Sequence, residues 1–313
     1  MAARLLISGS IAYDSIMVFD GHFKDHILPD RVHMLNVAFL VPQLKREFGG
    51  TAANIAYNAA LLGAAPAVLA TVGRDGAEYV QRLAGLGVDV QAVRQLDDQW
   101  SAQAFITTDL ADNQITAFHP GAMGEAHTVR VSDALPGAWG IVSPNGRQAM
   151  LDHARQFSEA GLPWIFDPGQ GLPMFDGADL RAFIESATAV AVNDYECGML
   201  VQRTGWSEDE IASKVDALVV TRGGEGSLVW TAGERQSVPA AAISRAVDPT
   251  GCGDAYRGGL LHALALGRGW TDAARLGSVM GAIKIEHAGA QNHSPTRDEI
   301  ARRHREAYGT SPW

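Results

Sequence analysis

A glycine-rich segment late in the chain places a carboxylate beside a candidate anion site. The sequence Asp248-Pro-Thr-Gly251-Cys252-Gly253-Asp254 leads directly into an apolar helical pattern. Two glycines before a helix let backbone N–H groups and the helix dipole converge on one point, which suits a phosphoryl group in transfer. Asp254 falls in the first helical turn, where its carboxylate can accept the proton of an attacking hydroxyl. The alternative is an ordinary loop-to-helix connection with Asp254 as a dipole partner.

A second glycine pair, near the N-terminal end, precedes an alanine-rich helical pattern. Gly49 and Gly50 allow close backbone approach to a ligand, and Asn54 offers both a donor and an acceptor from the first helical turn. A polyol suits such a site. The alternative is a tightly packed helix entry in which Asn54 satisfies a neighbouring loop.

The elements that must position these segments are short apolar runs alternating with helical patterns. The apolar runs predict strands at 5–7, 16–19, 67–72, 140–142, 164–166, 189–192, 217–220 and 227–230. The helical patterns cover 51–62, 77–86, 148–160, 180–186, 255–265 and 272–287. Alternation of this kind builds a parallel sheet covered by helices on both faces. We therefore expect one doubly wound α/β domain.

Two stretches interrupt the alternation, at residues 14–41 and 101–120. Within the second stretch, 103–108 and 114–119 have the pattern of two strands around a turn at 111–113. No flexible linker, low-complexity block or internal repeat sets these stretches apart. We therefore expect a small second sheet that is inserted into the main domain rather than an independent domain.

Composition and missing motifs exclude several classes of protein. Of 313 residues, 47% are hydrophobic and 19% charged, which excludes a disordered chain, and the apolar runs are shorter than the ~20 residues of a membrane span. A net charge of −10 disfavours nucleic acid as a partner. Cys197 and Cys252 lack metal-ligand or disulfide spacing, which favours a cytoplasmic protein. P-loop, dinucleotide-binding, zinc-protease and serine-hydrolase motifs do not occur.

With these segments in place, the sequence resembles the PfkB, or ribokinase-like, carbohydrate kinases. The Gly49–Asn54 and Asp248–Asp254 segments match the paired motifs of this family, and residues 191–196 and 219–226 match its intermediate elements in order and spacing. Within the family, the chain is most similar to bacterial nucleoside kinases of the adenosine kinase type. That closer similarity lies in residues 10–14, 26–30, 107–110, 113–123 and 166–171.

The resemblance implies a fold and an assembly. We expect a ribokinase-like three-layer α/β/α domain over residues 1–313, with a mostly parallel central sheet and a small β-sheet lid. The lid would come from insertions at about 12–41 and 100–121 and would close over the substrate. Some relatives pair through their lids, so a homodimer through the lid is also expected, and the apolar stretch 37–41 could form its contact.

The resemblance also implies catalytic and sugar-binding roles. Asp254 would be the base that activates the acceptor hydroxyl. The N–H groups of Gly251, Cys252 and Gly253 would stabilise charge on the phosphoryl group in transit. Asp14 would bind two ribose hydroxyls, and the other sugar-binding residues would be Gly49, Gly50 and Asn54.

Residues of the lid and of one loop would contact a purine base. Phe105 and Phe118 could stack on the ring, while Gln103 and Gln170 could hydrogen-bond its edge. The alternative is that the two phenylalanines fill the core of the small sheet.

The expected cofactors are ATP and Mg²⁺, with K⁺ as a third candidate. Glu196 would bind magnesium through water, beside Asn193, although the pair also has the spacing of a helix capping box. The remaining ATP-site residues would be Thr221, Gly223, Gly226 and His287, although a surface or packing role is the favoured alternative for the histidine. The candidate ligands of a monovalent cation are the Asp248 side chain and the carbonyls of Thr250 and Gly289.

Together these features predict a magnesium- and ATP-dependent kinase that phosphorylates the 5′-hydroxyl of adenosine or another purine ribonucleoside, such as inosine or guanosine. Two alternatives remain open. One is a kinase of a free sugar, such as ribose or fructose, and the other is a nucleoside or sugar sensor that keeps the fold without phosphoryl transfer.

Overall fold

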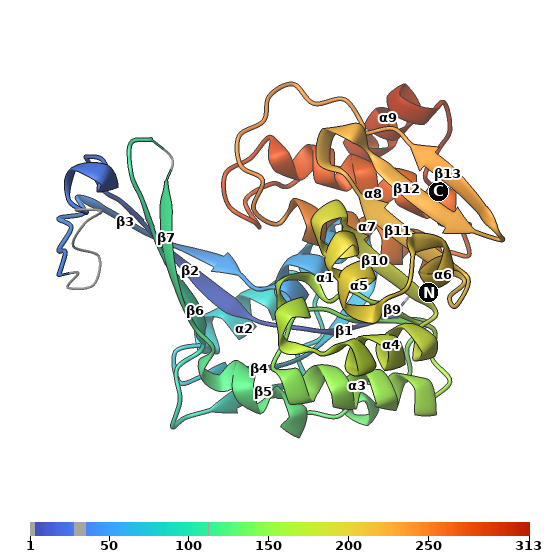
Figure 1. The fold of residues 1–313 in the computed structure, drawn as a ribbon, viewed down its shortest axis with the longest axis horizontal. Coiled ribbons are helices and arrows are strands. Elements are labelled where there is room, and N and C mark those ends of the chain that lie inside the picture. The colour runs from blue at the N-terminus through green and yellow to red at the C-terminus, as the bar shows by residue number, and fades with distance from the viewer. Residues whose placement is uncertain (1–3, 28–35, 112) are drawn as a thin grey trace.

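The computed structural model describes residues 4–27, 36–111 and 113–313 (Figure 1). Its largest element is a nine-stranded sheet in the order β13-β12-β11-β10-β9-β8-β1-β4-β5. Neighbouring strands from β5 to β11 are parallel, and β12 and β13 continue the sheet in antiparallel pairs. The strands are β1 (Arg4–Ser8), β4 (Ala65–Gly73), β5 (Val93–Leu96), β8 (Trp139–Val142), β9 (Trp164–Phe166), β10 (Ala189–Asn193), β11 (Ala217–Thr221), β12 (Ser227–Thr231) and β13 (Glu234–Val238).

Helices cover both faces of this sheet because successive strand residues point to opposite sides. On β1, Leu5 and Ile7 join one buried hydrophobic cluster, and Leu6 joins the other. The first cluster packs under α1 (Thr51–Leu61), α2 (Ala77–Gly85), α7 (Cys252–Ala265), α8 (Trp270–Ile285) and α9 (Arg297–Tyr308). The second packs under α3 (Arg147–Glu159), α4 (Gly177–Ser186), α5 (Asp194–Thr204) and α6 (Glu208–Ala212). The predicted three-layer α/β/α fold is therefore confirmed.

A four-stranded sheet in the order β3-β2-β6-β7 projects from the main body (Figure 1). Its strands are β2 (Ala12–Val18), β3 (Gln43–Gly49), β6 (Ala102–Thr108) and β7 (Gln114–His119). The β2–β6 pair is parallel, and the other two pairs are antiparallel. We call this the lid sheet. The first insertion was expected to end at residue 41, but β3 of the lid sheet lies beyond that residue. Residues 28–35 and 112 of the expected insertions lie outside the described residues.

Short 3₁₀ helices complete the structure at the loops between these elements. They are η1 (Phe23–Asp25), η3 (Gly121–Thr128), η4 (Val131–Asp133), η5 (Gly169–Met174) and η6 (Gly223–Glu225). None of the helices in the described ranges is both long and apolar enough to cross a bilayer.

Candidate active site

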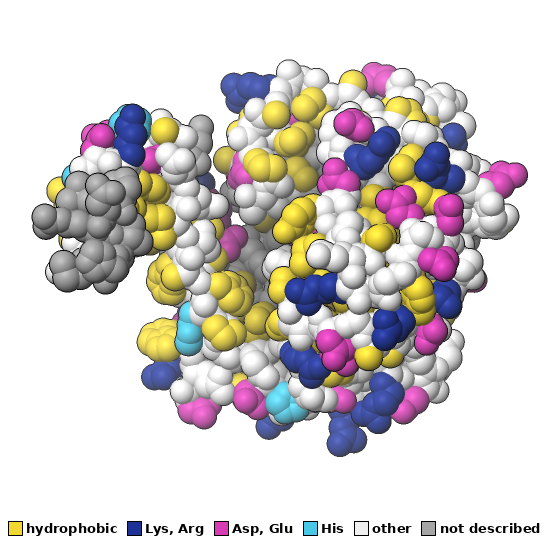
Figure 2. Space-filling view, viewed as in Figure 1, with side chains coloured by type: hydrophobic (Ala, Val, Ile, Leu, Met, Phe, Trp, Pro, Cys, Tyr) yellow, Lys and Arg dark blue, Asp and Glu magenta, His cyan; other side chains and the backbone are white. Residues whose placement is uncertain are grey.

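A cleft of about 950 Å³ lies between the lid sheet and the main body, and Figure 2 shows the hollow between these two parts. The lid side contributes Asp14 from β2 and Phe118 from β7. The opposite side is formed by the carboxyl ends of β10 and β11 and by the start of α7. This is the edge of an open parallel sheet where ligands commonly bind, and the volume is in the upper range of small-molecule sites.

The start of α7 has the geometry of an anion site. Gly251 precedes the helix with a φ of 76°, and a Cβ there would lie 2.8 Å from the Cβ of Ala290, so both conformation and space require glycine. The amides of Gly251 and Gly253 have no hydrogen-bond acceptor among the described residues. The Cys252 amide differs from expectation because it donates to the Pro249 carbonyl at 3.1 Å. Two of the three expected donors are therefore free for an anion.

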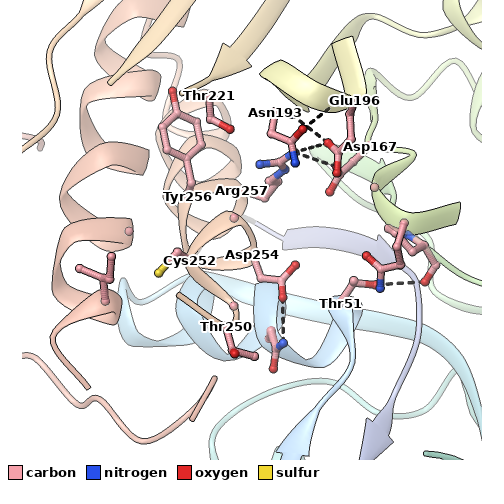
Figure 3. Close-up of a pocket in the computed structure, with 18 of the residues that line it drawn as sticks. Thr51, Asp167, Asn193, Glu196, Thr221, Thr250, Cys252, Asp254, Tyr256 and Arg257 are labelled. Atoms are coloured by element: carbon pink, nitrogen blue, oxygen red, sulfur yellow. Dashed lines mark hydrogen bonds and ion pairs between the residues drawn. The ribbon is translucent and has the colours of Figure 1, made fainter. Parts of the chain in front are cut away.

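Asp254 lies in the first turn of α7 and lines the cleft (Figure 3). Its Oδ2 accepts a hydrogen bond of 2.8 Å from Nδ2 of Asn54 on α1. Burial raises the pKa of Asp254 to about 6, while the Asn54 hydrogen bond opposes the rise. The carboxyl group is thus ionised at neutral pH and yet basic enough to accept a proton.

Asn54 also binds Gln291, whose Nε2 donates to the Asn54 Oδ1 at 2.9 Å. Both ends of this amide are therefore engaged inside the protein. In this state Asn54 contacts the Asp254 carboxylate and holds it in place, while its expected contact with a sugar remains a prediction.

Asp14 faces the cleft from the lid sheet, across from the start of α7. Burial raises the pKa of Asp14 to about 6, and the negative charges of Glu47 and Asp248 add to the rise. A Cβ on Gly49 would lie 2.5 Å from the Asp14 Oδ2, so a side chain at position 49 would displace this carboxylate. Gly50 has a φ of 91° and a backbone atom 2.5 Å from the place of a Cβ, so it too must be glycine. The two glycines therefore leave room for the Asp14 carboxylate and the chain around it.

Asn193 and Glu196 form the capping box that their spacing allows. The Glu196 amide donates to the Asn193 Oδ1 at 2.7 Å, and the Asn193 amide donates to the Glu196 Oε2 at 2.8 Å. The other oxygen of Glu196 has no hydrogen-bond donor among the described residues, and both side chains line the cleft. Mg²⁺ keeps several waters and needs few protein oxygens, so this carboxylate fits it. No cluster of three or more metal-ligating His, Cys, Asp or Glu residues occurs in the described part of the chain.

The register of the lid sheet decides which of its residues face the cleft. Asp14 pairs with Ala104, and Ala104 pairs with Phe118, so these three side chains share the cleft face. Gln103 and Phe105 flank Ala104 and point to the opposite face, because side chains alternate along a strand. The expectation that both contact the base is therefore wrong for this state of the lid. Neither residue lines the cleft; Gln103 instead donates to the Ser15 hydroxyl.

The remaining expected residues divide between the cleft and its surroundings. Gln170, on η5, lines the cleft, as do Thr221 at the end of β11, Gly223 in η6 and Gly226 directly after η6. His287 does not line the cleft, and its Nδ1 hydrogen-bonds the Ile283 carbonyl at 3.0 Å. His287 is exposed and therefore fits the surface role that was the alternative to contact with ATP.

The Asp248 side chain, one of the expected ligands of a monovalent cation, already has partners. The two carboxylate oxygens of Asp248 accept the amides of Thr250 at 2.8 Å and Gly289 at 2.7 Å. Gly289 thus turns its amide, rather than its carbonyl, toward Asp248. The Asp248 carbonyl accepts a hydrogen bond of 2.6 Å from Nζ of Lys284. The Asp248 carboxylate is therefore already engaged by backbone amides, and an ammonium group binds the neighbouring carbonyls of Asp248 and His287, where a potassium ion would compete with it.

The sequence matches the family described as pfkB family carbohydrate kinase over residues 12–297. The chain belongs to this family. Its membership makes it a phosphotransferase that acts on a hydroxyl group and uses ATP, as we predicted.

Individual relatives of this pfkB kinase agree with that assignment. The nucleoside kinase of Methanocaldococcus jannaschii is 28% identical over 280 residues, which cover 86% of this chain and 89% of that protein. The solved structure of Burkholderia thailandensis nucleoside kinase in complex with inosine is 50% identical, with a TM-score of 0.89 and coverage of 98% of this chain and 99% of that one. The same enzyme in complex with ADP-inosine is 52% identical, with a TM-score of 0.87 and coverage of 98% and 97%. The resemblance found in the sequence is thereby confirmed.

The sequence did not identify a buried ion pair that lines the cleft of this pfkB kinase. Arg257, on α7, is only 5% exposed and donates to the Asp167 Oδ1 at 2.9 Å and the Ala191 carbonyl at 3.1 Å (Figure 3). The same guanidinium lies 4.0 Å from Glu196. Burial raises the pKa of Asp167 to about 7, against the attraction of Arg257. The available signal was a charged residue within an apolar helical pattern, which is rare without a buried partner.

Proposed function

We propose that this pfkB kinase is a magnesium- and ATP-dependent nucleoside kinase that phosphorylates the 5′-hydroxyl of a purine ribonucleoside. Adenosine is the first candidate substrate, followed by inosine and guanosine. The observation that carries the proposal is the cleft that holds Asp254 beside the free amides of α7 on one side and Asp14 on the other. Relatives that are nucleoside kinases, one of them bound to inosine, support the choice of acceptor.

Phosphoryl transfer in this cleft needs a base and a site for the moving charge. The 5′-oxygen forms a bond to the γ-phosphorus while the bond from that phosphorus to the ADP oxygen breaks, and the hydroxyl proton passes to the Asp254 carboxylate. The amides of Gly251 and Gly253 would stabilise the charge on the γ-phosphoryl oxygens. The Asn54 amide would keep the Asp254 carboxylate directed at the acceptor.

The lid side would bind the nucleoside. Asp14 has two carboxylate oxygens that can accept hydrogen bonds from two neighbouring ribose hydroxyls. Gly49 and Gly50 keep the space around it clear. Phe118 could stack on the base and Gln170 could hydrogen-bond its edge, since both line the cleft. Closure of the lid would exclude water and so limit ATP hydrolysis.

ATP would lie along the carboxyl ends of β10 and β11. Thr221, Gly223 and Gly226 line that part of the cleft, and backbone N–H groups in such glycine-rich turns can bind phosphates. Glu196 and Asn193 would hold Mg²⁺ through water, and the ion when bound would neutralise phosphate charge.

The experiment that tests this function is a substrate panel with ATP and Mg²⁺. Adenosine, inosine, guanosine, ribose and fructose are compared by ADP release and by identification of the phosphorylated product. We expect the highest kcat/KM with a purine nucleoside and a product phosphorylated at the 5′ position. Higher kcat/KM with ribose or fructose would make the chain a free-sugar kinase, and no product from any acceptor would favour a sensor.

Two further expectations accompany this proposal. A homodimer through the lid would use the outer face of the lid sheet, where Leu44, Phe105 and Ile115 are exposed. Sedimentation of the purified chain, compared with an Ile115→Lys variant, tests that assembly. A cytoplasmic location stays a prediction from the sequence.

A further inference from the structure

Lys284 lies in the last turn of α8 and is fully buried. Its Nζ donates to the carbonyl of Asp248 at 2.6 Å and to the carbonyl of His287 at 2.9 Å. The first carbonyl belongs to the loop that leads into α7, and the second belongs to the loop that follows α8. One ammonium group therefore joins the two loops behind the anion site.

A buried ammonium group costs much free energy unless polar partners replace its water. Burial lowers the pKa of Lys284, and the nearby Cys252 and Asp248 oppose this shift. Two carbonyl oxygens at hydrogen-bond distance and a carboxylate in the same loop are partners that stabilise a single positive charge. The chain thus keeps a cation at a place where a neutral side chain would be less costly to bury.

The geometry around Lys284 is also that of a monovalent-cation site. Carbonyl oxygens that replace a hydration shell are the usual ligands of K⁺ in proteins. An ammonium group carries the same charge in a similar volume. The Asp248 carboxylate cannot turn toward an additional ion without losing the amides of Thr250 and Gly289.

The cation lies directly behind the residues that would bind the phosphoryl group. Asp248 is three residues before Gly251, and Gly251 packs against Ala290 so closely that a Cβ would lie 2.8 Å from it. The loops joined by Lys284 therefore contact each other at the start of α7. If these two loops move apart, the free amides of Gly251 and Gly253 no longer point toward the same anion position.

We propose that the ammonium group of Lys284 is a built-in cation, which takes the place of a bound monovalent ion and keeps the start of α7 in its anion-binding geometry. Lys284 is then a positioning residue, and the chain works without K⁺. This inference rests on phosphoryl transfer at α7, which is the centre of the proposed function.

The first test varies the monovalent ion with the unmodified protein. Activity on the preferred acceptor is measured with Mg-ATP in a tetramethylammonium buffer, with KCl or choline chloride added at equal ionic strength. We expect kcat to change by less than about twofold between the two salts. Activation by KCl of about tenfold or more would overturn the inference.

The second test removes the ammonium group. Lys284→Ala removes the ammonium group and leaves space beside the carbonyls of Asp248 and His287, and we expect kcat to fall about 100-fold with a smaller change in acceptor KM. Added KCl, NH₄Cl or ethylammonium chloride should then restore part of the lost rate in a saturable manner. Lys284→Met fills the space without charge and should stay slow in every salt. Lys214→Ala, at an exposed lysine on the other face, is the control and should keep the unmodified rate.

A thermal measurement separates this inference from the proposed function. The melting temperature of Lys284→Ala should rise with KCl relative to choline chloride, because an ion that binds only the folded state stabilises it. The unmodified protein and Lys284→Met should show no such difference. This readout holds even if no acceptor is phosphorylated, in which case the proposed function fails and the built-in cation stands. Equal melting behaviour of all three proteins in KCl, together with full activity of Lys284→Ala without K⁺, would refute the inference.

Discussion

At the scale of single residues, Asp254 carries the most direct prediction. Asp254→Asn keeps the size of the side chain and can still hydrogen-bond Asn54, but it cannot accept the hydroxyl proton. We expect kcat to fall by about 10²–10⁴-fold, with a small change in nucleoside KM and in melting temperature. Asp272→Asn, at an exposed position in the first turn of α8, is the matched control. Near-normal kcat in Asp254→Asn would remove Asp254 from the role of base.

The pH dependence of the reaction follows from the same carboxyl group. The pKa of Asp254 is raised to about 6, mainly by burial, so the group is protonated at pH 5 and ionised at pH 7. A base must be ionised to act, so kcat should rise with pH by about tenfold per unit below 6 and level off above 7. Measurements at saturating nucleoside and ATP, in buffers of constant ionic strength, check this profile. A flat profile from pH 5 to 8 would contradict it.

Single residues also mark the limit of what the sequence could predict. Asp254, Asp14 and Glu196 were predicted because their types and spacing suit a recognised chemistry, and all three line one cleft. Arg257 and Lys284 were not, because their partners are carbonyls and a carboxylate far along the chain. Arg257 binds Asp167, 90 residues away, and Lys284 binds the carbonyl of Asp248, 36 residues away. Helical periodicity shows that such a charged side chain faces the core. It does not show which distant group the side chain contacts there.

At the scale of elements, the start of α7 depends on the conformation of Gly251. Gly251→Ala places a side chain on a residue with left-handed backbone conformation, which costs free energy. The new Cβ would also lie only 2.8 Å from Ala290. The loop must therefore move, and the free amides move with it. We expect a stability loss of about 1–3 kcal/mol and a fall in kcat of about tenfold or more. Gly267→Ala is the matched control, because Gly267 has a φ of 77° but open space around it. It should lose about 1 kcal/mol and keep its kcat, and equal kcat losses in the two variants would contradict the assigned role of the loop.

The elements themselves were predicted well where burial is complete on both faces. The strands at 164–166, 189–192 and 217–220 are continuous apolar runs, and β9, β10 and β11 lie at those positions. β3 was missed because its sequence Gln43–Gly49 is mostly exposed and has three charged residues in its centre, so the lid sheet imposes no apolar pattern on it. α9 was missed for a similar reason, since only Ile300, Ala301 and His304 of its twelve residues are buried.

At the scale of the whole molecule, the lid sheet presents one face to the cleft and one face away from it. Asp14, Ala104 and Phe118 face the cleft, and Ile115 pairs with Thr107 on the other face. The sequence predicted both insertions but not this division, because the register between β2, β6 and β7 depends on pairings that alternation alone does not fix. The face of the lid sheet on which a residue lies therefore decides whether its side chain can contact a nucleoside in the cleft.

Two variants of β7 test that division. Phe118→Ala removes a ring from the cleft face, and we expect nucleoside KM to rise about tenfold and ATP hydrolysis without nucleoside to change little. Ile115→Ala removes a similar apolar area from the outer face and should leave KM unchanged. Both residues are about half exposed, so loss of core packing is small in either variant and the difference in KM reports contact with the base. An equal effect of the two variants on KM would mean that the lid reaches the nucleoside in another register, and the cleft face would then have to be reassigned.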